Sequence, residues 1–181
     1  AKIEQWAEDR NIIKGSKPID QAMKLFSEFG ELADNVGKGR DCKDDIGDVF
    51  VVLTIMCKQC NESIFSHFIN EFNVSGIKVD VAFLGAELSS IATELYEADG
   101  ATSYFPSVFV SHAINRLISI AKQSNTTLEE CVQIAYNDIK DRKGPMHNGV
   151  FIKESDPAYA PVVAAIESNC TIDEDALDNI E

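Results

Sequence analysis

Four acidic side chains stand out because of their spacing along the chain. Glu28 and Glu31 are three residues apart in one segment, and Asp45 and Asp48 are three apart in the next. If both segments are helical, each pair lies on one helix face, and two adjacent antiparallel helices bring the pairs together. Apolar neighbours along both segments place these carboxylates at the edge of an apolar interface.

A cluster of this kind requires cations. Burying several like charges together costs roughly several kcal/mol unless cations neutralise them. Hard divalent cations such as Mg²⁺ or Mn²⁺ suit a site made only of oxygen ligands, and no nearby His or Cys favours zinc. The spacing alone leaves a second interpretation open, in which the four residues belong to ordinary solvated helix surfaces.

Two helices must position these carboxylates. Residues 17–38 carry apolar side chains at spacings of three and four, which predicts a helix ended by Gly37 and Gly39. A second helix is predicted from near Asp41 to Asn61, with acidic residues at its positive N-terminal end. It is apolar on most faces, so we expect it to be central.

Further helices are predicted downstream, which makes the fold class all-α. The predicted ranges are 79–98, then 106–124 opened by Pro106, then 126–142 capped by Thr126 or Thr127. From Lys143 onward Gly and Pro break the periodicity. The strongly acidic tail from Glu154 is predicted to be irregular, with a short helix near 161–168.

A faint internal similarity relates residues 49–61 to 113–125, which share KQCN and KQSN and a matching leucine. It is consistent with a duplicated helical pair. It is equally consistent with two unrelated helices of similar amphipathicity.

Composition limits the classes of partner. The chain has 181 residues, 45% of them hydrophobic, and a formal net charge of −14. This charge disfavours nucleic acid, whose binding depends on Lys and Arg, but allows a small phosphorylated ligand held by metal ions and local basic residues. No apolar run approaches the roughly 18 residues that span a membrane, and the N-terminus does not look like a signal peptide. We therefore expect no membrane partner and a cytoplasmic location.

The amino-acid sequences of these segments resemble those of a known family. KLFSEFGELA (24–33) and DDIGDVFVVL (44–53) resemble the E-E-x-x-E and E-x-x-D signatures of the MazG-like all-α NTP pyrophosphatases. QWAEDRNII (5–13) and AYNDIKDRKGPMHNGVFIKESD (135–156) resemble the opening and closing segments of small MazG-like proteins of bacteriophages. The blocks agree in order, and the resemblance implies a four-helix-bundle-type fold.

The resemblance covers roughly residues 3–65 and 125–156, which leaves 66–124 as an apparent helical insertion. If this insertion is a duplicated pair, the bundle resembles the dimeric all-α dUTPases. Its Glu94-x-x-Glu97 lacks a D-x-x-D partner, so we interpret it as scaffold. We predict one all-α pyrophosphohydrolase domain over 1–153 and an acidic tail over 154–181.

Carried over residue by residue, the resemblance places Glu28, Glu31, Asp45 and Asp48 on the family's metal ligands, with Mg²⁺ expected and Mn²⁺ possible. It implies that Glu28 or Glu31 also orients or deprotonates the attacking water. Ser27 stands where the family usually has the first Glu of a doublet, and Asp45 stands where Glu is usual. These departures could weaken one metal position.

Basic residues suited to a polyphosphate are densest at Lys140, Arg142 and Lys143. Asn137, one turn earlier, is a candidate contact for sugar, base or phosphate. The alternative is a helix C-terminus that favours cations through its dipole. Trp6, the only tryptophan, is predicted either to stack on a base or to anchor a core or an interface.

The leading hypothesis is a Mg²⁺-dependent nucleoside triphosphate pyrophosphohydrolase that converts an NTP or dNTP to the monophosphate and pyrophosphate. One alternative is a narrower dUTP or dCTP pyrophosphatase. Another is a non-catalytic helical regulatory module with a decayed metal site. Because such helical units bury apolar faces by pairing, we expect a homodimer or homotetramer.

Overall fold

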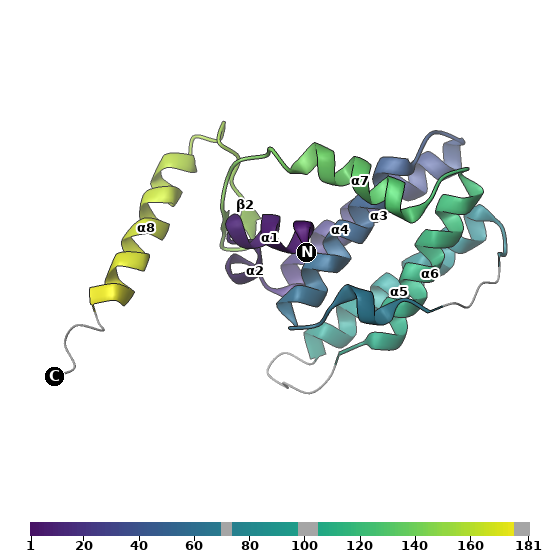
Figure 1. Ribbon diagram of the computed structural model, residues 1–181, viewed down its shortest axis with the longest axis horizontal. Coiled ribbons are helices and arrows are strands. Elements are labelled where there is room, and N and C mark those ends of the chain that lie inside the picture. The colour runs from purple at the N-terminus through teal and green to yellow at the C-terminus, as the bar shows by residue number, and fades with distance from the viewer. Residues whose placement is uncertain (70–73, 98–104, 176–181) are drawn as a thin grey trace.

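The computed structural model describes residues 1–69, 74–97 and 105–175, and its fold is all-α with one short hairpin (Figure 1). The elements are α1 (Lys2–Asp9), α2 (Ile12–Gly15), α3 (Pro18–Lys38), α4 (Lys43–Gln59), the 3₁₀ helix η1 (Ile64–His67), α5 (Ile77–Glu97), α6 (Ser107–Gln123), α7 (Leu128–Ile139), β1 (Met146–His147), β2 (Val150–Phe151) and α8 (Tyr159–Asp175). None of the helices in the described part of the chain has the length and apolar content needed to cross a bilayer.

The start and end of α3 follow from local chemistry. Pro18 opens the helix, and the Asp20 carboxylate accepts a hydrogen bond from the Lys17 backbone N–H at 2.8 Å, which satisfies one free donor of the first turn. Gly39 ends the helix with a φ of 66°, a conformation that glycine adopts without strain. The predicted helix 17–38 is confirmed, and the terminator is Gly39, because Gly37 lies inside α3.

The end of α7 is set by side chains from α1. The predicted helix 126–142 begins with Thr127 as its cap and stops at Ile139. The Trp6 indole N–H donates to the Ile139 carbonyl at 2.9 Å, and the Arg10 guanidinium donates to the carbonyls of Lys140 and Arg142 at 3.0 and 2.6 Å. These donors satisfy carbonyls that the helix end leaves free, so α7 is shorter than predicted.

The central helix is α4, as its apolar character predicted. It packs against α3 on one side and α7 on another, while α5 packs against α3 and α6. A large core joins α3, α4, α5, α6 and the start of α7. A smaller core lies between α1, α2, α4 and the end of α7, and the hairpin closes over it. This smaller core forms the floor of the candidate site.

The C-terminal tail differs from its prediction. Instead of an irregular segment with a short helix near 161–168, α8 runs from Tyr159 to Asp175. The Asp156 carboxylate accepts a hydrogen bond from the Ala158 backbone N–H at 2.8 Å just before the helix, and the Ala-containing sequence that follows favours helix. Figure 1 shows α8 standing away from the other helices. The predicted helix end at Ala98 and residues 176–181 of the tail lie outside the described residues.

Candidate functional site

A hollow of about 290 Å³ lies where α1, α3, α4, the end of α7 and the hairpin meet. We call it the charged hollow, because apolar side chains of the smaller core form its floor and acidic and basic side chains surround them. Its lining residues with polar or charged side chains are Asp20, Gln21, Lys24, Glu28, Asp48, Arg142 and Lys153.

Glu28 and Asp48 enter the charged hollow from different helices. Glu28 is only 6% exposed on the inner face of α3 and forms an ion pair with Lys24, one turn earlier. Asp48 is half-buried on α4. Burial, followed by the negative charges of Glu28 and Asp44, raises the pKa of Asp48 to about 7. Two of the four predicted carboxylates therefore line one hollow, which disfavours the ionised form of Asp48.

Two more carboxylates extend this group along α4. Asp45 is 9% exposed and accepts a hydrogen bond from the Asn35 side-chain nitrogen at 2.8 Å. Burial raises the pKa of Asp45 and Glu28 adds to the rise, although the hydrogen bond from Asn35 opposes it. Burial and the charge of Asp138 likewise raise the pKa of Asp44, which faces α7.

We call Glu28, Asp44, Asp45 and Asp48 the acidic edge. Its donors are the carboxylate oxygens that Mg²⁺ and Mn²⁺ prefer, and burial, with neighbouring carboxylates, raises the pKa values of its aspartates. The donor chemistry therefore fits a hard divalent cation. Within the described residues, however, no three acidic, His or Cys side chains converge closely enough to form a ready-made metal site. Binding a cation requires side-chain rotation, starting with Glu28, which Lys24 now holds.

Glu31 lies apart from the acidic edge. The inner face of α3 runs through Leu25, Glu28 and Leu32, and this leaves Glu31 exposed. It does not line the charged hollow, and its charge does not contribute to the raised pKa values of the α4 aspartates. Its assignment as a metal ligand and catalytic residue stays a prediction.

The predicted substrate-binding residues divide in the same way. Arg142 and Trp6 line the charged hollow, and the charge of Arg142 opposes the rise in the Asp48 pKa. Trp6 is 8% exposed, and the Arg10 guanidinium lies 5.0 Å from its ring centroid, which covers part of the ring. Its position suits both predicted roles, the core anchor and the stacking surface.

The other three predicted contacts do not line the charged hollow. Lys143 lines a separate hollow with Arg10 and residues of α8. Lys140 and Asn137 are exposed, and the Lys140 ammonium donates to the Asn137 side-chain oxygen at 3.4 Å. Their roles as substrate contacts stay predictions.

Several lining residues were missed by the sequence analysis. Lys24 had a usable signal, since it precedes Glu28 by one helical turn. Lys153 and Gln21 had none, because the hairpin brings Lys153 to the hollow and a hydrogen-bond network holds Gln21 there.

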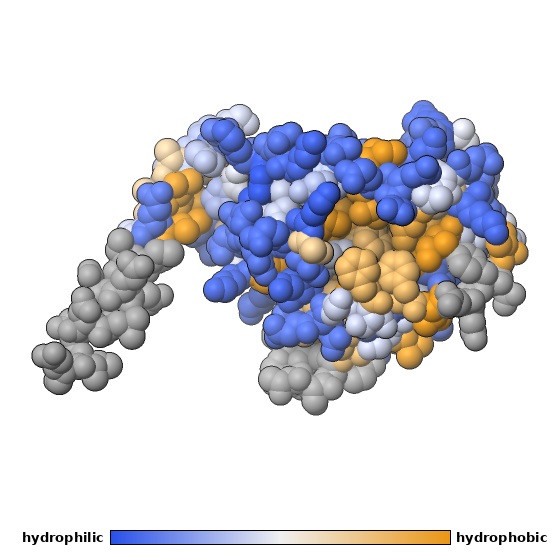
Figure 2. Space-filling model, viewed as in Figure 1, coloured by the Kyte–Doolittle hydropathy of each residue, from blue (hydrophilic) through white to orange (hydrophobic). Residues whose placement is uncertain are grey.

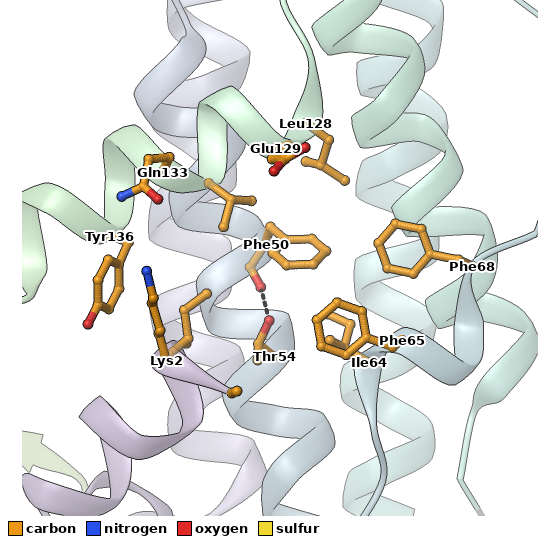
Figure 3. Close-up of a pocket in the computed structure, with 13 residues that line it drawn as sticks. Lys2, Phe50, Thr54, Ile64, Phe65, Phe68, Leu128, Glu129, Gln133 and Tyr136 are labelled. Atoms are coloured by element: carbon orange, nitrogen blue, oxygen red, sulfur yellow. Dashed lines mark hydrogen bonds between the residues drawn. The ribbon is translucent and has the colours of Figure 1, made fainter.

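A second hollow of about 490 Å³ lies on another face of α4 (Figure 3). Phe50 and Thr54 of α4 face η1, whose Phe65 is 66% exposed, and the neighbouring Phe68 is 43% exposed. Figure 2 shows apolar side chains gathered on this face, at the centre and right of the view. The charged side chains that line it are Lys2 and Glu129. This hollow lacks the acidic edge and its basic partners, so it is a poor candidate for phosphate chemistry.

No protein-family model and no solved structure matches the chain. Over 59 residues it is 54% identical to an uncharacterized 18.2 kDa protein from the rep-hol intergenic region of Haemophilus phage HP1 (strain HP1c1). The match covers 32% of this chain and 36% of that protein, so the chain spans about a third of the length of the curated relative it matches. The printed name of this relative assigns no activity.

Proposed function

We propose that the chain is a Mg²⁺-dependent nucleoside triphosphate pyrophosphohydrolase of the MazG-like kind, which converts an NTP or dNTP to the monophosphate and pyrophosphate. The observation that carries the proposal is the convergence of Glu28 and Asp48, from two helices, on one hollow that Lys24, Arg142 and Lys153 also line. Carboxylates beside cations in a partly apolar hollow suit a nucleotide whose phosphates are bound together with a metal ion.

In this proposal the acidic edge holds Mg²⁺, with Glu31 a further predicted ligand. Bound Mg²⁺ neutralises phosphate charge and lowers the pKa of a coordinated water. Arg142 and Lys153 contact the phosphates, and Trp6, which lines the same hollow, packs against the base. The oxygen of the attacking water forms a bond to the α-phosphorus. At the same time the bond between the α-phosphorus and the oxygen that bridges to the β-phosphorus breaks, and pyrophosphate leaves with that electron pair. In this proposal either Glu28 or Glu31 accepts the proton from the attacking water.

The test is pyrophosphate release from each of the eight common NTPs and dNTPs, with and without Mg²⁺. We expect Mg²⁺-dependent release that falls at least about 100-fold in Glu28→Gln and in Asp48→Asn. Glu31→Gln decides whether the exposed carboxylate takes part. Glu94→Gln on α5 is the matched control, because it removes one negative charge away from the charged hollow. Absence of release from every nucleotide would contradict the proposal.

Two alternatives are separated by the same panel. Turnover of dUTP or dCTP alone identifies a narrower pyrophosphatase. Absence of turnover of every nucleotide together with absence of Mn²⁺ binding identifies a non-catalytic regulatory module with a decayed metal site. The expected homodimer or homotetramer is a separate proposal, supported by the exposed Phe65 and Phe68, because contiguous exposed aromatic side chains mark interaction surfaces.

A further inference from the structure

Gln21 has an unusual position in the charged hollow. It belongs to the first turns of α3, is 4% exposed and lines the hollow among apolar residues of the smaller core. Its side-chain nitrogen donates to the Ser16 hydroxyl oxygen at 2.9 Å. The surrounding hydrogen bonds determine which way the side-chain oxygen of a buried amide points.

The Ser16 hydroxyl decides the orientation of this amide. Its single proton is donated to the Ile12 carbonyl at 2.7 Å, so toward other groups its oxygen only accepts. Gln59 also donates its side-chain nitrogen to this oxygen at 3.0 Å, and to the Ser16 carbonyl at 2.8 Å. Gln21 must therefore turn its NH₂ toward Ser16, and its carboxamide oxygen points the opposite way.

The Gln21 oxygen is an open acceptor. It accepts no hydrogen bond from the described residues. Unlike the side-chain oxygen of Gln59, which is unpaired and fully enclosed, the Gln21 oxygen remains accessible. Since Gln21 lines the charged hollow, we infer that its oxygen faces this hollow. The adjacent Asp20 lines the same hollow with a second acceptor group, one oxygen of which is bound to the Lys17 N–H. This part of the hollow offers acceptors to a ligand.

We propose, resting on the proposed function, that Gln21 recognises the amino group at C4 of cytosine or at C6 of adenine, so that the substrates are cytosine or adenine nucleotides. An amino group offers two N–H donors to acceptors that otherwise stay unpaired. The carbonyl at the corresponding position of uracil, thymine or hypoxanthine directs an oxygen at the same acceptors, and the ring N–H next to this carbonyl carries that oxygen beside it. Neighbouring apolar residues and Trp6 accommodate the ring of either kind of base. The amino group therefore determines which base binds more tightly.

The test uses the fluorescence of Trp6, the only tryptophan of the chain, during titration with dCMP and with dUMP, without turnover. These nucleotides differ at the position where an amino group replaces a carbonyl; dAMP and dIMP form the matching purine pair. We expect about tenfold tighter binding of the amino-bearing partner in one pair or both. The preference should fall to about one in Gln21→Leu, which removes the acceptor. The ratio of kcat/KM for dCTP over dUTP should follow the same pattern.

Ser16→Ala provides an independent variant, because it leaves Gln21 in place but frees its amide to rotate. We expect this variant to keep its helical circular dichroism and to lose most of the amino preference. Equal binding of both members of each pair, tighter binding of dUMP or dIMP, or no binding of any of the four would overturn the proposal. Hydrolysis without amino preference refutes this inference and leaves the pyrophosphohydrolase standing. Selective dCMP or dAMP binding without any hydrolysis refutes the enzyme and leaves Gln21 as the base-reading residue.

Discussion

The α3–α4 pair and the α5–α6 pair are both helical hairpins, but their buried acidic side chains have opposite surroundings. Asp80, at the start of α5, is fully buried and accepts hydrogen bonds from Arg116, Ser119 and Gln123 of α6, at 2.8, 2.7 and 2.7 Å. Along the acidic edge, by contrast, burial first, and then the charge of Glu28 from α3, raises the pKa values of Asp45 and Asp48 on α4.

The difference separates scaffold from candidate site. A buried carboxylate with one cation and two neutral donors is satisfied within the protein and needs no ligand. Carboxylates placed beside carboxylates carry a charge repulsion that a bound cation would relieve, which is why we propose the acidic edge as the cation site. This contrast supports interpreting residues 66–124 as scaffold and placing the chemistry on α3 and α4.

The largest effect on stability is expected from Asp80→Ala. Removal of this carboxylate leaves the partly buried Arg116 and two polar side chains without their acceptor, which should lower the free energy of unfolding by about 3 kcal/mol. Urea denaturation followed by circular dichroism measures the change. Asp34→Ala, which removes exposed ion pairs with Lys38 and Arg40, is the control and should change the free energy of unfolding far less. Equal effects of the two variants would contradict the interpretation of Asp80 as a buried carboxylate that its hydrogen bonds stabilise.

The next effect concerns the close approach of α4 and α7 beside the acidic edge. A Cβ on Gly47 would lie 2.7 Å from the Ala135 Cβ and would also overlap the Cys131 carbonyl oxygen. Gly47→Ala should therefore destabilise the protein by about 2 kcal/mol. Gly30→Ala is the matched control in α3, where a Cβ meets nothing within 4 Å, and it should stabilise by about 0.5 to 1 kcal/mol. Thermal unfolding of both variants tests this prediction, and a neutral Gly47→Ala would show that the helices are not in tight contact.

The smallest expected effect concerns the pH dependence of stability, which depends on Asp48 of the acidic edge. The pKa of Asp48 rises from 3.8 to about 7 on folding, so its ionisation destabilises the folded protein increasingly as pH rises between those values, and fully above them. Metal-free Asp48→Asn should therefore melt about 2 to 4 °C above the wild type at pH 8, since the half-exposed site reduces the effect to roughly 1 kcal/mol. The advantage should shrink toward pH 4. A difference independent of pH would show that Asp48 ionises normally.

Much of the helical scaffold could be predicted, because its signals are local. The periodicity of 17–38, the proline at 106 and the threonine cap at 127 fixed helices that the structure confirms. The short α1 and α2 and the hairpin were not predicted, since they are stabilised by distant contacts such as the bond from Trp6 to the Ile139 carbonyl.

The candidate site was predictable in part for the same reason. The i, i+3 spacing singled out Glu28 and Asp48, which do meet. Spacing could not show that the inner face of α3 excludes Glu31 from the charged hollow, because the exact rotation of the helix depends on packing. Lys153 and Gln21 reach the hollow through tertiary structure, which leaves no trace in local sequence.

The most direct test of the central claim is calorimetric titration of the protein with Mn²⁺, which reports on the acidic edge without any assumption about substrate. We predict that the wild type and Glu94→Gln bind Mn²⁺ with equal affinity, and that Asp48→Asn and Glu28→Gln bind it at least about tenfold more weakly. Wild-type protein that binds no Mn²⁺, or Asp48→Asn and Glu28→Gln variants that bind it as tightly as the wild type, would contradict the account.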